Sequence, residues 1–172
     1  MRLFNPSFII FYALGVLSTP SNDGLSVTVD LSSYFNNVGV SASPGDADFD
    51  GHNGSYPVNQ LPTGILVYRG VNVSFILKLM KSFDRRSLVQ FTLPPWDSSS
   101  ADNVLAQGQI INLTPGRFHS LHLFGAGDGG SIYTNNLSVT YSDGTVVSQP
   151  ILIPGWKSGR VSSNSLIIII TV

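Results

Sequence analysis

The acidic loop at residues 44–54 holds the densest set of side chains that could do chemistry. Asp46, Asp48 and Asp50 alternate with other residues and are followed by a glycine. This spacing matches the start of a calcium-binding loop, in which hard oxygen ligands converge around a sharp turn. The position that should carry a bidentate Glu is Pro57, which excludes an EF-hand. A structural calcium site in a β-sandwich loop is one hypothesis. A turn whose Asp side chains accept nearby backbone N–H groups is the alternative.

A second group of residues could bind a sugar. Sugar rings lay their C–H faces on aromatic rings while their hydroxyls bond carboxylates and amides. A tryptophan in a proline-stiffened loop, a tyrosine beside a proline and the neighbouring polar residues supply these groups. Packing of the tryptophan over the edge of the core is the alternative. The predicted ligand-binding residues are Trp96, Asp97, Asp102, Asn103 and Tyr56.

Signs of catalysis are weak, and no catalytic residue is assigned. His119 and His122 are three residues apart, so on one strand they point to opposite faces and cannot share a metal. The chain has no G-x-S-x-G nucleophile motif. A glycoside hydrolase needs two carboxylates across the scissile bond, and both would have to be Asp. A glycosidase that uses the Asp residues of loop 46–50 with Asp97 or Asp102 as acid and base is therefore a second hypothesis, below binding.

Composition points to an all-β chain that positions these residues on loops. The 172 residues include ten carboxylates, all of them Asp, with nine Lys or Arg, 17 Gly and 10 Pro. Asp, Asn, Ser, Gly and Pro favour turns and compete with the helical backbone, which argues against helical bundles and doubly wound α/β domains. Because cysteine is absent, disulfides, thiolate zinc sites and cysteine nucleophiles are excluded. A net charge of −1 gives no case for nucleic acid as a partner.

Short strand signals with turn residues between them recur along the chain. A Ser-Asp-Gly turn at 142–144 between two alternating segments is the strongest hairpin signal. Such spacing is typical of an antiparallel β-sandwich or barrel. The predicted strands are 25–31, 65–68, 89–93, 109–113, 118–124, 137–141 and 145–148.

Both ends of the chain differ from this framework. Residues 1–19 have a basic start, an apolar run and a small-residue exit, which predicts a secretory signal peptide, with a buried first strand or helix as the alternative. Residues 158–172 are predicted to be an atypical apolar tail, β-prone and prone to aggregation but too short to span a membrane. Four Asn-x-Ser/Thr glycosylation acceptors agree with export: Asn53, Asn72, Asn112 and Asn136.

Residues 71–90 form a block that interrupts the framework. They hold four of the nine basic residues, lack Gly and Pro, and have the best helical spacing in the chain. Val codons begin with GT and Gln90 can be encoded by CAG, the bordering sequences of a typical intron; Val161-Ser162 could likewise be encoded by GTGAGT. One hypothesis is therefore a retained intron translated in frame, and the other is a genuine amphipathic insertion in a surface loop.

Several motifs, in their order along residues 27–70 and 91–157, resemble a known family. They are Val29–Leu31, Tyr34–Asn37, Gly45–Gly51, Ser55–Pro57, Leu61-Pro62, Leu93–Trp96, Asp102–Ile111, Leu123–Ala126 and Val139–Gly144. Together they resemble the galactose-binding-like domains of secreted fungal proteins and of modules beside bacterial glycoside hydrolases. The resemblance implies a jelly-roll β-sandwich over 25–157, interrupted at 71–90. Such domains continue past residues 154–156, so it also implies a sandwich that is incomplete at the C-terminus.

The function expected from the sequence is carbohydrate binding without catalysis. The leading hypothesis is a secreted, extracellular, calcium-compatible β-sandwich whose partner is a glycan or cell-wall polysaccharide. It has no nucleic-acid partner and no membrane span. The alternatives are the glycosidase, or a fragment of one, and a mis-spliced, truncated product without activity.

Overall fold

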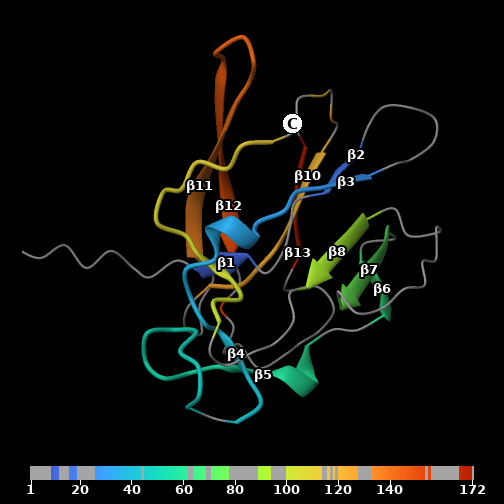
Figure 1. Cartoon of the computed structure of the whole chain (residues 1–172). Coiled ribbons are helices and arrows are strands. Elements are labelled where there is room, and N and C mark those ends of the chain that lie inside the picture. Colours follow the sequence, from blue (N-terminus) through green and yellow to red (C-terminus); the bar gives the residue numbers. More distant parts are fainter. Residues whose placement is uncertain are drawn as a thin grey trace, which may run out of the picture.

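A computed structural model describes the chain in separate stretches (Figure 1). The described residues are 9–11, 16–18, 26–43, 45–61, 64–68, 71–77, 89–93, 100–113, 116, 118, 120–127, 133–153, 155 and 167–171.

The described residues form strands and two short 3-10 turns, with no α-helix among them. The turns are η1 (Ser32–Tyr34) and η2 (Val58–Gln60). The strands are β1 (Ile9–Phe11), β2 (Val16–Ser18), β3 (Ser26–Thr28), β4 (Val40–Ser41), β5 (Tyr56–Pro57), β6 (Gly64–Tyr68), β7 (Val71–Leu77), β8 (Val89–Leu93), β9 (Val104–Leu105), β10 (Ser120–Phe124), β11 (Tyr133–Thr140), β12 (Val146–Ile153) and β13 (Ile167–Thr171). This strand content agrees with the predicted all-β class.

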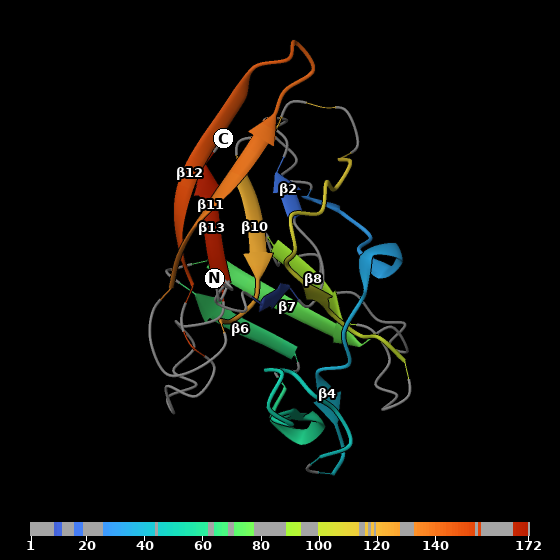
Figure 2. The ribbon, with the colours of Figure 1, turned by 90° about the vertical axis from the view of Figure 1, so that its left-hand side faces the viewer.

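The strands pair in small sheets, most of them antiparallel. The largest has the order β13-β10-β2-β3, and a three-stranded sheet has the order β6-β7-β8. Figure 2 shows β6, β7 and β8 running across the direction of β10 and β13. The remaining pairs are β11-β12, β1-β9 and the parallel pair β4-β5.

The buried core joins segments that are far apart in the sequence. Phe91 of β8 and Phe124 of β10 lie with ring centroids 5.7 Å apart, so the three-stranded sheet contacts the four-stranded one. Burying such side chains is the main driving force for folding. The buried apolar residues are Val29, Leu31, Val40, Ala47, Phe49, Leu61, Phe91, Leu93, Val104, Leu121, Leu123, Phe124, Ala126, Ile151 and Ile153.

The predicted hairpin around residues 142–144 is confirmed. Strands β11 and β12 pair from Tyr133↔Ile153 to Thr140↔Val146 without a break in register. Gly144 has a φ of 85°, which a glycine adopts at no steric cost, and its N–H donates to the carbonyl of Tyr141 at 3.0 Å. The strands predicted at 65–68 and 89–93 are confirmed as β6 and β8.

The strand predicted at 109–113 is wrong. Its residues form no strand, because polar side chains close a local turn before it. The backbone N–H of Gln107 donates to the side-chain oxygen of Gln109 at 2.7 Å, and Gln109 Nε2 donates to the Leu105 carbonyl at 2.7 Å. Gly108, with a φ of 84°, makes this turn possible.

The helical pattern in block 71–90 is also misleading. Val71–Leu77 is a strand, antiparallel to β6 and parallel to β8. The β-branched residues Val71, Val73 and Ile76 favour this extended backbone, and pairing on both sides outweighs a weak helical spacing. Residues 78–88 lie outside the described part of the chain.

Parts of both predicted end segments form strands. Ile9–Phe11 and Val16–Ser18, within the predicted signal peptide, pair with β9 and with β10 and β3. The rest of residues 1–19 is not described, and the signal peptide stays a prediction. In the predicted apolar tail, Ile167–Thr171 pairs antiparallel with β10 along its full length. Among the described residues, none belongs to a helix that could cross a bilayer.

Candidate functional site

The acidic loop is folded by its own carboxylates. Asp48 Oδ1 accepts the backbone N–H of Asn53 at 2.9 Å. Asp50 Oδ1 accepts the backbone N–H groups of His52 at 3.0 Å and Gly54 at 2.9 Å. These short-range bonds are typical of Asx turns, which Asp forms because its oxygens reach its own backbone. Two of the three predicted metal ligands therefore shape the loop, as the sequence-based alternative proposed.

The same loop is anchored to the body by backbone bonds and one aromatic contact. The Asp48 N–H donates to the Val38 carbonyl at 2.9 Å, and the Tyr56 N–H donates to the Gly39 carbonyl at 2.8 Å. Phe49 is buried, and its ring meets the Tyr56 ring edge-on at 4.7 Å. Burial raises the pKa of Tyr56 above its usual range. Tyr56 thus packs between loop and body, and only part of it reaches solvent.

Asp102 fixes the backbone beneath the loop. Its side chain is 1% exposed, and its two oxygens accept the N–H groups of Gly39 at 2.9 Å and Val40 at 3.0 Å. Asn103 Nδ2 donates to the same carboxylate at 2.8 Å. Burial raises the pKa of Asp102, while the bonds from Gly39, Val40 and Asn103 act in the opposite direction.

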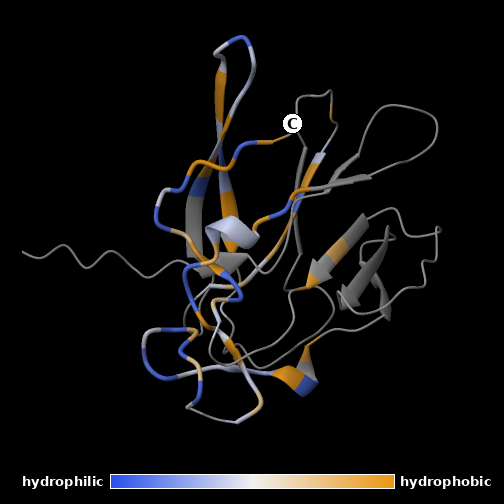
Figure 3. Cartoon of the chain, viewed as in Figure 1, coloured by the Kyte–Doolittle hydropathy of each residue, from blue (hydrophilic) through white to orange (hydrophobic). Residues whose placement is uncertain are grey.

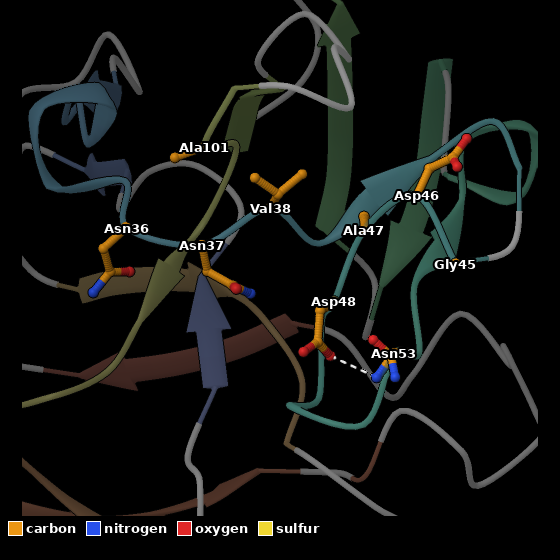
Figure 4. Close-up of a pocket in the computed structure, with 9 residues that line it drawn as sticks. All are labelled: Asn36, Asn37, Val38, Gly45, Asp46, Ala47, Asp48, Asn53 and Ala101. Carbon is orange, nitrogen blue, oxygen red and sulfur yellow. Dashed lines mark hydrogen bonds between the residues drawn. The ribbon is translucent and has the colours of Figure 1, made fainter.

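These segments surround an open polar depression of about 430 Å³, shown in Figure 4. Five side chains at its walls carry amide or carboxylate groups, and none of the described residues that line it is Lys or Arg. Figure 4 shows the Asp46 carboxylate turned away from that of Asp48, while Asp48 points towards Asn53. The lining residues are Asn36, Asn37, Val38, Gly45, Asp46, Ala47, Asp48, Asn53 and Ala101.

The two adjacent asparagines in this depression differ in what they bond. Asn36 Oδ1 accepts the Leu105 N–H at 2.6 Å and its Nδ2 donates to the Leu105 carbonyl at 3.1 Å, so Asn36 is held to β9. Asn37 Nδ2 is buried and finds no hydrogen-bond acceptor among the described residues. A buried amide donor without a partner costs about 1–3 kcal/mol.

The depression does not fit calcium in this arrangement. Asp46 is exposed and turned away, Asp48 and Asp50 each hold backbone N–H groups, and Asp50 is buried. The described residues contain no group of three or more His, Cys, Asp or Glu that could hold a metal ion. Hard cations need six or more converging oxygens, and in this loop Asp48 Oδ1 and Asp50 Oδ1 accept backbone N–H groups instead.

The structure places the predicted ligand-binding residues in different environments. Asp102 and Asn103 are 1% and 0% exposed; Asp102 accepts two backbone N–H groups, and Asn103 Nδ2 donates to Asp102. Trp96 and Asp97 are outside the described residues, and their roles stay predictions. Asn36 and Asn37 were missed as site residues. An Asn-Asn pair just after a predicted strand was the available signal, because two amides in a loop can donate and accept at once.

The predicted glycosylation acceptors are largely accessible. The side chains of Asn53, Asn112 and Asn136 are exposed, and Asn72 lies on β7, where only the backbone is described. Asn53 is also a wall of the depression, with a φ of 61° that asparagine tolerates better than most residues. A glycan on Asn53 would therefore stand at the mouth of the depression.

One serine–histidine pair is present on β10. Ser120 Oγ and His122 Nε2 are 2.7 Å apart. His122 is 6% exposed, burial lowers its pKa, and its Nδ1 has no hydrogen-bond partner among the described residues. No described carboxylate orients the imidazole, so the pair lacks the third member of a catalytic triad. His119 lies outside the described residues.

Comparison of the chain with protein-family models, with curated proteins and with solved structures finds no match.

Proposed function

We propose that this chain is a secreted, non-catalytic module that binds carbohydrate in the depression between the acidic loop and Asn36–Val38. The fold that we propose for it is a galactose-binding-like jelly-roll sandwich. Its strand-rich described residues and the order of its sequence motifs support this fold. The exposed Asn112 and Asn136 side chains suit N-glycosylation in the secretory pathway.

The donor of Asn37 is the observation that carries the proposal. It is buried in the wall of a depression and has no acceptor among the described residues. In this proposal the wall of the depression shifts on binding and exposes this amide, so that a sugar hydroxyl can accept from it and donate to a neighbouring oxygen at the same time. Further hydrogen-bonding groups around the depression are the amides of Asn36 and Asn53 and the carboxylates of Asp46 and Asp48. A volume of about 430 Å³ is within the usual range for small-ligand sites.

The charge of the depression's lining favours a neutral ligand. The described lining of the depression has two carboxylates and no basic side chain, so it would repel a phosphate or other anion. Neutral polysaccharides, such as those of a cell wall, suit this lining, and nucleic acids do not. In this proposal Trp96 and Asp97, which lie outside the described residues, remain predicted ligand-binding residues, and calcium is not required.

Catalysis stays the weaker alternative. Asp102 has a raised pKa, as a general acid would, but it is 1% exposed and its oxygens hold two backbone N–H groups. A general acid must reach the glycosidic oxygen, and this carboxyl does not reach solvent. Aryl glycosides should therefore remain intact in the presence of the purified chain.

Binding to an array of fungal and plant glycans tests the proposal. Asn37→Ala should abolish retention of the glycan that the wild type binds, and Trp96→Ala should weaken it. Asn112→Ala removes an exposed asparagine away from the depression and should leave binding unchanged. An absence of binding to every neutral glycan, or equal binding by the Asn37→Ala chain, would contradict the proposal.

A further inference from the structure

The buried imidazole of His122 lies in the middle of the four-stranded sheet. Strand β10 pairs with β13 on one side and with β2 on the other, and the residues opposite His122 in these ladders are Ile169 and Val16. In Figure 2, β10 runs beside β13, and β8 runs across their direction. A charge on His122 would therefore arise inside the sheet rather than at its edge. This feature is separate from the polar depression and does not depend on the proposed function.

Both faces of β10 are buried. Successive side chains of a strand alternate between its faces, so Leu121 and Leu123 share one face, and both are buried. His122 and Phe124 share the other face and are also buried, and the ring centroid of Phe124 is 5.7 Å from that of Phe91 in β8. Figure 3 shows apolar segments on both β10 and β8. The imidazole thus lies on the face where the two sheets meet.

The two ring nitrogens of His122 differ in what they contact. Nε2 is 2.7 Å from Ser120 Oγ, whereas Nδ1 is buried and has no hydrogen-bond partner among the described residues. A neutral imidazole has one donor and one acceptor nitrogen, but an imidazolium donates from both. Protonation would therefore add an N–H donor and a full charge at a place that is closed to water, and burying an unpaired charge is very unfavourable.

The strands next to this imidazole have no charged side chain that could compensate. Strands β13 and β2 pair with β10, and their sequences are IIIIT and VLS. Strand β8, which contacts β10 through Phe91, is VQFTL, and β3, the next strand of the sheet, is SVT. Within β10, His122 is the only ionisable residue, and His119 before it lies outside the described residues. Burial lowers the pKa of His122, and none of these strands supplies a carboxylate that would raise it.

We infer that His122 is an acid switch: protonation of its imidazole separates β10 from its neighbours and opens the four-stranded sheet. A charged imidazole is favourable in water, and it reaches water only when the pairing and packing that bury it are lost. Among the described strands, β13 pairs with β10 alone, so β13 is released in the same step.

Acidification should weaken the sheet because of the direction of this pKa shift. The folded-state pKa of His122 is below the usual 6.5, so the unfolded chain takes up the proton at a higher pH than the folded chain does. The stability that the neutral imidazole contributes is therefore full above 6.5 and is lost as the pH falls through the folded pKa. The raised pKa of Asp102 acts in the opposite direction, so the wild type must be compared with variants that differ at a histidine alone.

Amide hydrogen exchange at about pH 7 and about pH 5, corrected for the intrinsic effect of pH on exchange, tests the switch. In the wild type, the amides of β10 and β13 should lose protection at the lower pH. In His122→Leu they should keep it, because leucine fills the site without an ionisable group. His52→Gln removes an exposed imidazole and should lose protection as the wild type does. Wild-type protection that is equal at both pH values, or that falls equally in His122→Leu, overturns the inference.

A measurement on the wild type keeps the inference falsifiable if His122→Leu fails to fold. The ring C–H resonances of His122, followed by NMR during an acid titration, report protonation of the imidazole directly. Proton uptake should occur below the usual pKa of 6.5 and should coincide with the loss of protection in β10. An imidazole that takes up its proton while β10 and β13 stay protected overturns the switch.

Discussion

Asp102 accepts the backbone N–H of Val40 at 3.0 Å, across a separation of 62 residues. The same carboxylate accepts the N–H of Gly39 at 2.9 Å, and both groups are buried. Asp102 thus joins the loop before β9 to the strand that supports the polar depression. The sequence suggested Asp102 as a ligand-binding residue, and the structure shows its carboxylate bonded to the backbone of a distant segment.

Replacing Asp102 should destabilise the whole chain. Asp102→Ala leaves the buried N–H groups of Gly39 and Val40 without acceptors, and each such loss costs about 1–3 kcal/mol. We expect a loss of about 3 kcal/mol in the free energy of unfolding, measured by urea denaturation. Asp143→Ala, at the exposed hairpin turn, is the matched control and should change this quantity far less. A variant at Asp102 as stable as wild type would exclude the anchoring role.

The ionisation of Asp102 should also appear in the pH dependence of stability. Burial raises its folded-state pKa above the usual 3.8, so the folded chain takes up this proton at a higher pH than the unfolded chain does. This contribution to stability is full below 3.8 and is lost as the pH rises through the folded pKa. Between about pH 7 and about pH 4, the wild type should therefore gain stability relative to Asp102→Asn. Unfolding free energies of both chains that run parallel over this range would contradict the shift.

Calcium should leave the thermal midpoint of the chain unchanged. Asp48 and Asp50 direct oxygens at the backbone N–H groups of Asn53 and Gly54, and Asp46 points away from them. A ligand that binds only the folded state raises its stability, so a melt with and without calcium reports binding directly. Midpoints in millimolar calcium and in excess chelator should agree. A rise in calcium that Asp48→Asn removes would show that the loop rearranges around the ion.

Local chemistry explains what could be predicted from the sequence. The Ser142-Asp143-Gly144 turn and its alternating flanks depend on neighbouring residues, and the hairpin is where they place it. The Asp-rich loop was recognised for the same reason, with self-bonded turns as one of two interpretations. By contrast, the burial of Asp102 depends on segment 37–40, far away in the sequence, and spacing carries no information on it.

The strand β7 shows the same limit. Its apolar spacing matches a helix in isolation, but β6 and β8 supply hydrogen bonds on both sides, and these outweigh local preference. The Asn37 Nδ2 donor, which has no acceptor among the described residues, could not be predicted from the sequence either, because it results from packing around one side-chain atom. Residue type suggested which groups were available, and only tertiary contacts showed which of them were already used.

Deleting residues 71–90 separates the two hypotheses on this block. The structure uses Val71–Leu77 as the middle strand of β6-β7-β8, and the deletion also removes Val89 and Gln90 from β8. Because β6 and β8 do not pair with each other, the deleted chain should lose its cooperative thermal transition. Replacing only residues 78–88 with a Gly/Ser linker of equal length keeps both strands and should preserve the transition.

The retained-intron hypothesis predicts the opposite result. The deleted chain should then melt cooperatively and the full chain should not, because Tyr68 would lead directly through residues 69–70 into the strand at Phe91. Circular dichroism melts of the three chains, run side by side, decide between these outcomes.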